Sequence, residues 1–486
     1  MLFNSYIFIF LFLPVALAGY ALLKRTGTTP PKVWLIGMSL WFYGYFNIGY
    51  LTIMVCSILF NYLVYLWMKA AGEGKMKPAL VIGVTGNVLL LVYYKYFDFL
   101  TECVNAVFKT DIPLKDILLP LGISFFTFQQ IGFLADTYRG DVTDCTFTNY
   151  ALFVSFFPQL IAGPIADYGS MMPQYAKIGP DMGFDRDRFR RGIAIFIAGL
   201  ASKVLIADTF GKSVDYAYAS AEYINSPEAL LAILFYALQL YFDFNGYCNM
   251  AIGLGALFGI DIPVNFDSPY KSRNIIDFWR SWHITLNKFL TRNVYIPLGG
   301  SIKGELRTYV NLMIVFLISG IWHGAGFNFI IWGLMHGVMY VTVRLLRDKT
   351  AIKCDKALSH ILTFIFICIA WVFFRAKDTS EALTLLGRVV HGGLSRLGDG
   401  FLKGFNSGEF WYVLKVLHLT GSEAGRYIVM ILYTVVSLTV VFFAPNALKV
   451  TEKMRYRTFY GVVLGIIFVW CVLSLSGVST FLYFNF

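Results

Sequence analysis

The stretch DFWRSWHITLNKFLTRNVYIPLGGSIKGELRTYVNLMIVFLISGIWHGAGFNFIIWGLMH, from Asp277 to His336, contains three of the six histidines of the chain. One of them, His323, lies inside an otherwise apolar run from Ile314 to Leu334. An ionisable side chain is costly in such a run, so it marks a candidate functional site. The small residues Gly324-Ala325-Gly326 follow it and would let another segment or a ligand approach its ring.

The composition outside this stretch is that of a membrane protein. Hydrophobic residues make up 57% of the chain and charged residues 14%, whereas about 25% charged residues is usual in soluble domains. The mean hydropathy is +0.64. At about 20 apolar residues per spanning helix, the chain has room for roughly a dozen membrane segments. We predict an all-α polytopic membrane protein that forms one membrane domain over residues 1–486.

The positive charge and the cysteines exclude several other classes. The formal charge is +11, but the lysines and arginines gather in short clusters between apolar runs. Such clusters are typical of cytoplasmic loops that face anionic membrane lipid, so we expect no nucleic-acid partner. The seven cysteines are scattered and form no CxxC motif, and HExxH does not occur. Neither a disulfide framework nor a bound metal is predicted.

The positive-inside rule gives the orientation. No Lys or Arg precedes the first apolar run, while Lys24 and Arg25 follow it, so the N-terminus is expected to be extracytoplasmic. The basic loop Lys449–Arg457 is expected to be cytoplasmic, which places the end of the chain outside as well. The other predicted spans lie near Val33–Phe46, Tyr50–Met68, Ala79–Leu100, Ile117–Phe133, Tyr150–Ala166, Gly192–Phe210, Ala229–Phe258, Ile361–Phe374, Val429–Phe443 and Phe459–Thr480.

Glycine and proline interrupt several of these spans, as in Leu119–Gly122 and Ala162–Pro164. Broken helices are tolerated at membrane depth where protein or a watery cavity covers the freed backbone groups. The breaks therefore indicate either a central funnel or tunnel, or kinks packed against neighbouring helices. The polar, glycine-rich region 376–426 is predicted to be an interfacial loop region.

A second group of polar residues precedes His323. If Ser272–Phe289 is one helix, its polar residues recur at spacings of three and four and share one face. Such a stripe lines a wet cavity or belongs to an interfacial amphipathic helix. The residues of this stripe are Asp277, Arg280, His283 and Asn287.

A lone histidine inside a membrane suits general-base catalysis, because its pKa near 6.5 leaves it mostly neutral and able to accept a proton at pH 7. His336 lies about 20 Å further along a continuous helix. The two histidines can share a site only if the glycines break that helix. The structural interpretation of His336 is a buried imidazole with hydrogen-bond partners.

Long motifs in one order carry a resemblance to a known family. They are LPLGISFFTFQQIGFLADTYRGD from Leu119, FFPQLIAGPI from Phe156, QLYFDFNGYCNMAIGLG from Gln239, FWRSWHITLNKFL from Phe278, YIPLGG from Tyr295 and GIWHGAGFNFIIWGLMHG from Gly320. The chain resembles the membrane-bound O-acyltransferases, and more narrowly the membrane subunit of bacterial alginate, peptidoglycan and cellulose O-acetyltransferases. Alginate-type relatives typically read FDFSGYSDMAIG where this chain has Asn245, Cys248 and Asn249.

The resemblance implies a fold with a central tunnel and broken or re-entrant helices, and acetyl-CoA as donor substrate. It implies that His323 stands at the position of the family's essential histidine, and that His283 assists catalysis on a helix that lines the acyl tunnel. The tunnel-lining set implied with it is Asp277, Arg280, Asn287, Trp322 and Asn245.

The end of the chain, residues 481–486, has two interpretations. By itself the aromatic sequence FLYFNF is typical of a belt at the membrane interface. Related systems carry an F-x-Y-x-x-F motif whose tyrosine is thought to receive the acyl group, and Phe481, Tyr483 and Phe486 match it. The resemblance thus implies that Tyr483 is catalytic and lies outside the cytoplasm.

We predict that the protein is an enzyme of the bacterial cytoplasmic membrane. Acetyl passes from acetyl-CoA to Tyr483, with His323 as base, and then to an extracytoplasmic SGNH-hydrolase-like partner that acetylates a cell-envelope polysaccharide. One alternative is transfer of D-alanine from a carrier protein to teichoic acid. Others are a transporter or flippase for polysaccharide precursors, which would favour internal repeats, and a scaffold for an export complex.

Overall fold

Helices make up most of the molecule. The computed structural model describes residues 1–349, 355–406, 411–454, 458–476 and 481–482, and these residues form helices and connections without a strand. Within them, eight helical segments are long and apolar enough to cross a membrane. The protein is therefore an all-α polytopic membrane protein, as predicted.

The eight segments are α3 (Ile48–Ala71), Lys77–Phe108 with α4 (Lys77–Leu91) and α5 (Phe97–Phe108), Arg186–Ala219 with α10 (Arg186–Ala201) and α11 (Asp208–Ala219), α12 (Ser226–Leu257), α15 (Glu305–His323), α16 (Phe327–Lys349), α17 (Lys356–Arg375) and α21 (Glu423–Phe442). Shorter helices are α1 (Leu13–Leu23), α2 (Thr29–Gly44), α6 (Ile123–Tyr138), α7 (Phe147–Ser155), α8 (Phe157–Leu160), α9 (Tyr168–Ala176), α13 (Ile275–Ser281), α14 (Ile284–Leu290), α18 (Thr379–His391), α19 (Asp399–Leu402), α20 (Trp411–Val416), α22 (Ala447–Lys453) and α23 (Thr458–Leu473).

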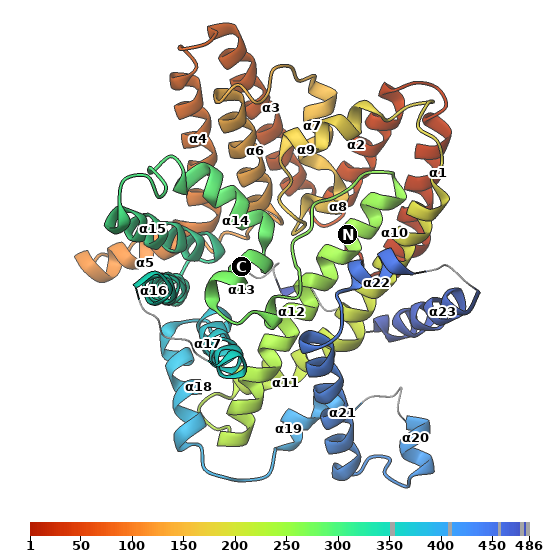
Figure 1. Ribbon diagram of the computed structural model, residues 1–486, viewed down its shortest axis with the longest axis vertical. Coiled ribbons are helices and arrows are strands. Elements are labelled where there is room, and N and C mark those ends of the chain that lie inside the picture. The colour runs from red at the N-terminus through yellow and green to blue at the C-terminus, as the bar shows by residue number, and fades with distance from the viewer. Residues whose placement is uncertain (350–354, 407–410, 455–457, 477–480, 483–486) are drawn as a thin grey trace.

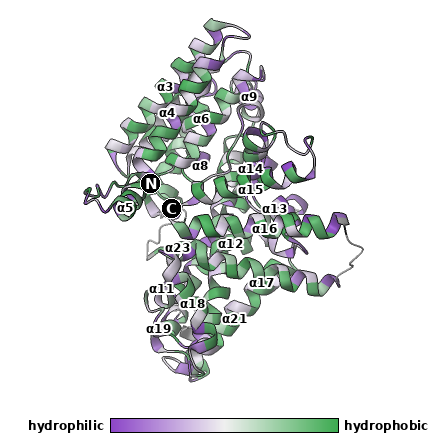
Figure 2. Ribbon diagram, turned by 90° about the vertical axis from the view of Figure 1, so that its left-hand side faces the viewer, coloured by the Kyte–Doolittle hydropathy of each residue, from purple (hydrophilic) through white to green (hydrophobic). Residues whose placement is uncertain are grey.

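Helix α12 runs through the middle of the molecule, between the N-terminal helices in red to yellow and the C-terminal helices in blue (Figure 1). A capping box fixes its start: the side chain of Asn225 accepts a hydrogen bond from the N–H of Glu228, whose carboxylate accepts one from the N–H of Asn225. Apolar residues dominate the helices around α12, and hydrophilic residues gather at helix ends and connections (Figure 2).

Glycines bring α10 and α12 into direct backbone contact. A Cβ atom added at Gly199 would lie 2.5 Å from the carbonyl oxygen of Gly246, and one added at Gly253 would lie 2.6 Å from that of Gly192. Lipid supplies no hydrophobic drive for helix association, so close packing through small residues is what stabilises such a crossing. These glycines are required by the spacing of the two backbones.

Several predicted spans are broken where proline and glycine interrupt them. The span expected over Ile117–Phe133 begins as a helix only at Ile123, after Gly122, whose φ of 73° lies in the left-handed region. The prediction of a span over Tyr150–Ala166 is wrong. The chain forms α7 and the short α8 there, and then turns, because Pro158 and Pro164 lack the N–H that a continuous helix needs.

Other regions differ from or extend the sequence interpretation. The region 376–426, expected as a loop region, contains α18, α19 and α20 and the first residues of α21.

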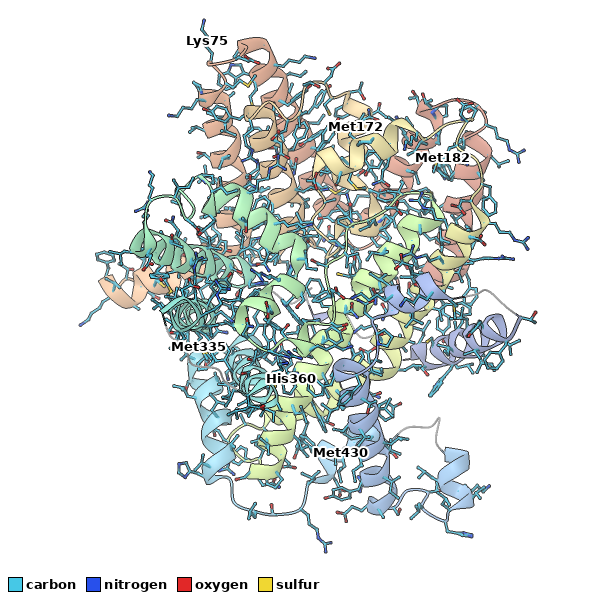
Figure 3. All side chains as sticks on the ribbon, viewed as in Figure 1. Lys75, Met172, Met182, Met335, His360 and Met430 are labelled. Atoms are coloured by element: carbon cyan, nitrogen blue, oxygen red, sulfur yellow. The ribbon has the colours of Figure 1, made fainter. Side chains whose placement is uncertain are left out.

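Side chains fill the space between the helices; the labelled Lys75 projects outward from the turn between α3 and α4, whereas His360 lies among the central helices (Figure 3). The two ends of the chain approach the same residue, since the rings of Phe3 and Phe481 both contact Tyr247.

The α10–α12 crossing gives a test of the packing. We expect Gly253→Ala to lower the free energy of unfolding by about 1–3 kcal/mol, because the new methyl group must push two backbones apart. The matched control is Gly465→Ala in α23, where an added Cβ meets no atom within 4 Å. Thermal unfolding of the detergent-purified proteins measures both; equal stability of the two variants would contradict the proposed packing.

Candidate active site

His323 lies at the tip of a helical hairpin. Helix α15 ends at His323, Gly324 is extended, and α16 begins at Phe327. The two helices cross closely, since a Cβ at Gly320 would lie 2.4 Å from the carbonyl oxygen of Phe329, and one at Gly333 would lie 2.5 Å from that of Phe316. The apolar run therefore breaks at Gly324, and the close crossing at Gly320 and Gly333 packs α16 against α15. His323 at the tip is buried, with an exposed fraction of 3%.

His283 lies at a second helix break. The prediction of one helix over Ser272–Phe289 is wrong: α13 ends at Ser281 and α14 starts at Ile284. His283 between them has φ 46° and ψ 51°, a left-handed conformation that is rare for a residue with a side chain and persists where neighbours enforce it. The ring of His283 is fully buried.

The break separates the residues that were predicted to share one polar face. Asp277 and Arg280 form an ion pair on the outer side, with side chains 50% and 71% exposed. Asn287 instead donates from Nδ2 to the carbonyl oxygens of Trp279 and Trp282, at the end of α13. The predicted polar face does not form, because the spacing of its residues assumed an unbroken helix.

Asn265 holds the second break and fixes the tautomer of His283. Its backbone oxygen accepts from the N–H of Ile284 at 3.0 Å, and its Oδ1 accepts from the N–H of Thr285 at 3.2 Å. His283 Nδ1 lies 3.1 Å from the same Oδ1. Because Oδ1 is an acceptor, Nδ1 carries the hydrogen and Nε2 of the neutral ring is the basic nitrogen. Sequence reasoning did not identify Asn265.

The structure brings His283 and His323 together. Their ring centroids are 6.4 Å apart, and the buried Trp322 contacts both rings, at 6.1 and 4.9 Å. Helices α13 to α16 lie beside one another in both views (Figures 1 and 2). Two histidines that are forty residues apart in the sequence thus form one buried pair, which we call the histidine pair.

His336 stands behind this pair. The glycine break folds α16 back, so the ring of Trp332 lies between His323 and His336, at centroid distances of 5.0 and 4.9 Å. Nε1 of Trp279 donates to Nδ1 of His336 at 3.2 Å. His336 is buried with a hydrogen-bond partner, as the structural interpretation of the sequence expected.

Lys95 supports the hairpin tip from another helix. It lies in the π-helix η2 (Val92–Tyr96), and its Nζ donates to the carbonyl oxygens of Trp322 at 2.7 Å and His323 at 2.9 Å. The last carbonyls of a helix lack partners and carry partial negative charge, so a cation stabilises them. Sequence reasoning did not name Lys95, although a lysine inside the apolar run Ala79–Leu100 was a signal for it.

A cavity of about 310 Å³ lies between α6 and α14, near the histidine pair. Its mouth is charged: Asp136, Lys288 and Arg292 line it, and Arg292 pairs with Asp136 and Asp141 at 3.0 and 2.6 Å. The other lining residues are Phe128, Gln129, Gly132, Phe133, Ile165, Ala166, Asp167, Pro263, Thr285, Phe289 and Asn293.

Two lining residues connect the cavity with the pair. The ring of Phe128 stacks on those of Phe289 and Trp322, at 4.4 and 5.0 Å. Thr285 donates from Oγ1 to Asn265 Oδ1, the atom that binds His283. A ligand in this cavity is therefore separated from the imidazoles by one layer of side chains.

The last described residues lie inside the protein, with exposed fractions of 1% for Phe481 and 9% for Leu482. The N–H of Leu482 donates to Asp243 Oδ2 of α12 at 3.1 Å. Asn245, on the same helix, is half-buried. Tyr483 and Phe486 lie outside the described residues. Within the described residues, no group of three or more His, Cys, Asp or Glu could hold a metal ion.

Two buried imidazoles beside a cavity lined by charged residues, within a bundle of membrane-length helices, have the form of an active site embedded in a membrane. The chain belongs to the MBOAT, or membrane-bound O-acyltransferase, family, whose model matches residues 35–377. It is thus a membrane-bound acyltransferase.

Relatives agree with this assignment. The chain is 44% identical over 421 residues to the peptidoglycan O-acetyltransferase of Helicobacter pylori, covering 80% of each chain. It is 36% identical over 432 residues to the probable alginate O-acetylase AlgI of Pseudomonas aeruginosa, covering 87% of this chain and 81% of the relative. Identity to the teichoic acid D-alanyltransferase of Bacillus subtilis is 26% over 349 residues, covering 67% and 84%.

We expect Asn265 to contribute to acyl-transfer activity as well as to stability. Asn265→Leu leaves buried donors without an acceptor, which costs about 1–3 kcal/mol of stability, and frees the ring of His283. The matched control is Asn311→Leu, since Asn311 is equally buried and binds the carbonyl oxygens of Leu298 and Gly300. Both variants should unfold at lower temperature, but only Asn265→Leu should lose acyl transfer per folded protein. Equal losses would refute a role at the site.

Lys95 is expected to position His323. Lys95→Met removes the donor from the tip of the hairpin, and we expect kcat to fall by roughly tenfold or more while KM for the acyl donor changes little. Lys115→Met is the control, because the Nζ of Lys115 lies over the rings of Tyr93 and Phe97. Steady-state kinetics on the reconstituted proteins measures kcat and KM separately. A change in KM alone would contradict the role of Lys95 in positioning His323.

Proposed function

We propose that the protein is a transmembrane O-acetyltransferase of the bacterial cytoplasmic membrane. In this proposal it takes acetyl from cytoplasmic acetyl-CoA onto Tyr483 and passes it to an extracytoplasmic partner that acetylates a cell-envelope polysaccharide. The observation that carries the proposal is the histidine pair, buried at two helix breaks and separated from a charged cavity by one layer of side chains. The functions of the Helicobacter and Pseudomonas relatives support acetyl as the transferred group and polysaccharide as the acceptor.

The charged cavity fits a donor from the cytoplasm. Its mouth is joined to the basic turn after α3, since Arg292 pairs with Asp141, and Lys69 pairs with Asp144 of the same loop at 2.6 Å. By the positive-inside rule this turn faces the cytoplasm. Lys288 and Arg292 could then bind the phosphates of coenzyme A, which suits guanidinium and ammonium donors, while the acetyl end enters the aromatic part of the cavity.

In the first step His323 acts as general base. It accepts the phenol proton of Tyr483, whose oxygen attacks the thioester carbonyl of acetyl-CoA. A C–O ester bond forms, the C–S bond breaks, and the proton passes from the imidazole to the thiolate of coenzyme A. Ionising a phenol with pKa near 10 costs about 4 kcal/mol at pH 7, and a positioned base relieves this cost.

His283 is assigned a supporting role in the same step. With its Nδ1 hydrogen directed to Asn265, its Nε2 can accept a hydrogen bond. The two ring centroids are 6.4 Å apart, so one group beside them can contact both imidazoles. We propose that His283 orients the group that His323 deprotonates. Trp322 contacts both rings and so holds them relative to one another.

In the second step the acetyl group leaves Tyr483 for a serine hydroxyl of the extracytoplasmic partner. The aryl ester bond breaks, an alkyl ester forms, and the phenol regains a proton. Such a covalent relay divides a transfer across the membrane into two easier steps. Coenzyme A stays in the cytoplasm, and both termini lie on the outer side. The burial of Phe481 and Leu482 beside α12 supports an inward approach of the tail.

Mass spectrometry of the C-terminal peptide tests the proposal. After incubation of the reconstituted protein with acetyl-CoA, we expect an added acetyl group on Tyr483 in the parent protein and none in Tyr483→Phe. His323→Ala should reduce the adduct by roughly two orders of magnitude or more, the range of general-base catalysis.

The matched control is His391→Ala, at the exposed end of α18, which should keep the adduct. Persistence of the adduct in His323→Ala would refute the general-base role. Polysaccharide acetylation by Tyr483→Phe at the parent rate would refute the relay.

A further inference from the structure

Three ionisable side chains meet inside the membrane-length helices, away from the histidine pair. Lys203 lies in the π-helix η3 (Ser202–Ala207), between α10 and α11, and its side chain is 2% exposed. Its Nζ contacts Asp208 Oδ1 at 2.6 Å and Asp243 Oδ1 of α12 at 2.7 Å. Asp243 is 2% exposed, whereas Asp208 reaches partly to the surface at 19%. Charged groups at membrane depth are costly and generally mark a function.

Stability alone does not account for the pair Lys203–Asp243. Replacing a buried ion pair by apolar residues of similar volume is often neutral or stabilising. The glycine contacts already hold α10 against α12, at Gly199 and Gly246, next to the pair. The pair is therefore not needed to join these two helices, and its other contacts indicate what it binds.

Those contacts are with the end of the chain. Asp243 Oδ2 accepts the N–H of Leu482 at 3.1 Å, and the Nζ of Lys203 lies 5.0 Å from the ring centroid of Phe481. The same ring packs edge-on against Tyr247, at 4.6 Å. One backbone hydrogen bond, one cation–π contact and one aromatic contact thus hold two consecutive residues.

Two adjacent faces of helix α12 contact the tail and the histidine site. Asp243 and Tyr247, four residues apart, contact the tail. Phe244 and Cys248, one position further along, face the histidine site: Phe244 contacts the ring of His283 at 5.0 Å, and Cys248 binds Asn265. Successive residues of a helix point about 100° apart, so the two sites are neighbours on one helix.

We propose that the Lys203–Asp243 pair is a docking site for Phe481 and Leu482 near the end of the chain, and that it positions the acceptor tyrosine for acyl transfer. The inference rests on the proposed function, because it assigns Tyr483 as the acceptor. Tyr483 follows Leu482 directly, so the bond from Leu482 to Asp243 limits how far the acceptor can travel. Lys203 and Asp243 are positioning residues, since they act through the tail.

The test uses two double variants of the full chain, each without the ion pair. Lys203→Met with Asp243→Leu removes both charges and the acceptor for Leu482, while Lys203→Met with Asp243→Asn keeps an amide oxygen as acceptor. Asp215→Asn is the matched control, because Asp215 pairs with Arg375 at the surface, with side chains 64% and 27% exposed. Thermal unfolding verifies that each variant is folded.

The first readout does not depend on acyl chemistry. Leu482→Cys is introduced into each protein, and peptide mass spectrometry follows alkylation of position 482 by a maleimide. We expect alkylation at least about tenfold faster in the Met/Leu variant than in the parent, because the tail is no longer held. The Met/Asn variant should fall between them, and the control should match the parent.

The second readout is acetyl incorporation at Tyr483 in proteins without the added cysteine. It should fall by about tenfold or more in the Met/Leu variant and partly recover in the Met/Asn variant. Unchanged alkylation in a folded Met/Leu variant overturns the docking site. Faster alkylation with full acetyl incorporation overturns the positioning role.

A different result would refute the proposed function itself. If Tyr483→Phe acetylates polysaccharide at the parent rate, the tyrosine is not the acceptor, whatever the alkylation rates of the docking variants show.

Discussion

A helix can break at membrane depth only if other groups satisfy the backbone atoms that the break frees. Both histidines of the candidate site occupy such breaks. Lys95 donates to the carbonyl oxygens at the end of α15, Asn287 does so at the end of α13, and Asn265 accepts from the start of α14. The breaks turn the two imidazoles inward, so the side chains that stabilise the backbone also define the site.

Helix α12 is the second organising element, because one helix serves three contacts. Its glycines let α10 approach, its Phe244 and Cys248 face the histidine site, and its Asp243 and Tyr247 hold Phe481 and Leu482. The histidine site and the described end of the tail therefore lie along one helix. The proposed relay requires this arrangement, since the acyl group must meet the acceptor without passing through lipid.

The sequence predicted the class of fold and part of the site. Apolar runs identified the membrane helices, and the cost of a histidine inside one run identified His323, which the structure buries at the hairpin tip. The glycines after it were the condition for a shared site with His336, and they do break the helix. The prediction that Asp277 and His283 share a polar face was wrong, because spacing rules assume a continuous helix. The helix is broken at His283, and Asn265, eighteen residues earlier, supports the break.

What the sequence determined by itself is local: where apolar residues are numerous enough to span a membrane, where proline and glycine interrupt a helix, and which residues of the long motifs carry the family resemblance. The tertiary structure decided which of these residues meet. Lys95 reaches His323 across 228 positions, and Leu482 reaches Asp243 across 239. Such contacts leave no periodic signal, because they arise only when separate helices pack and their unsatisfied polar groups find partners in an environment without water.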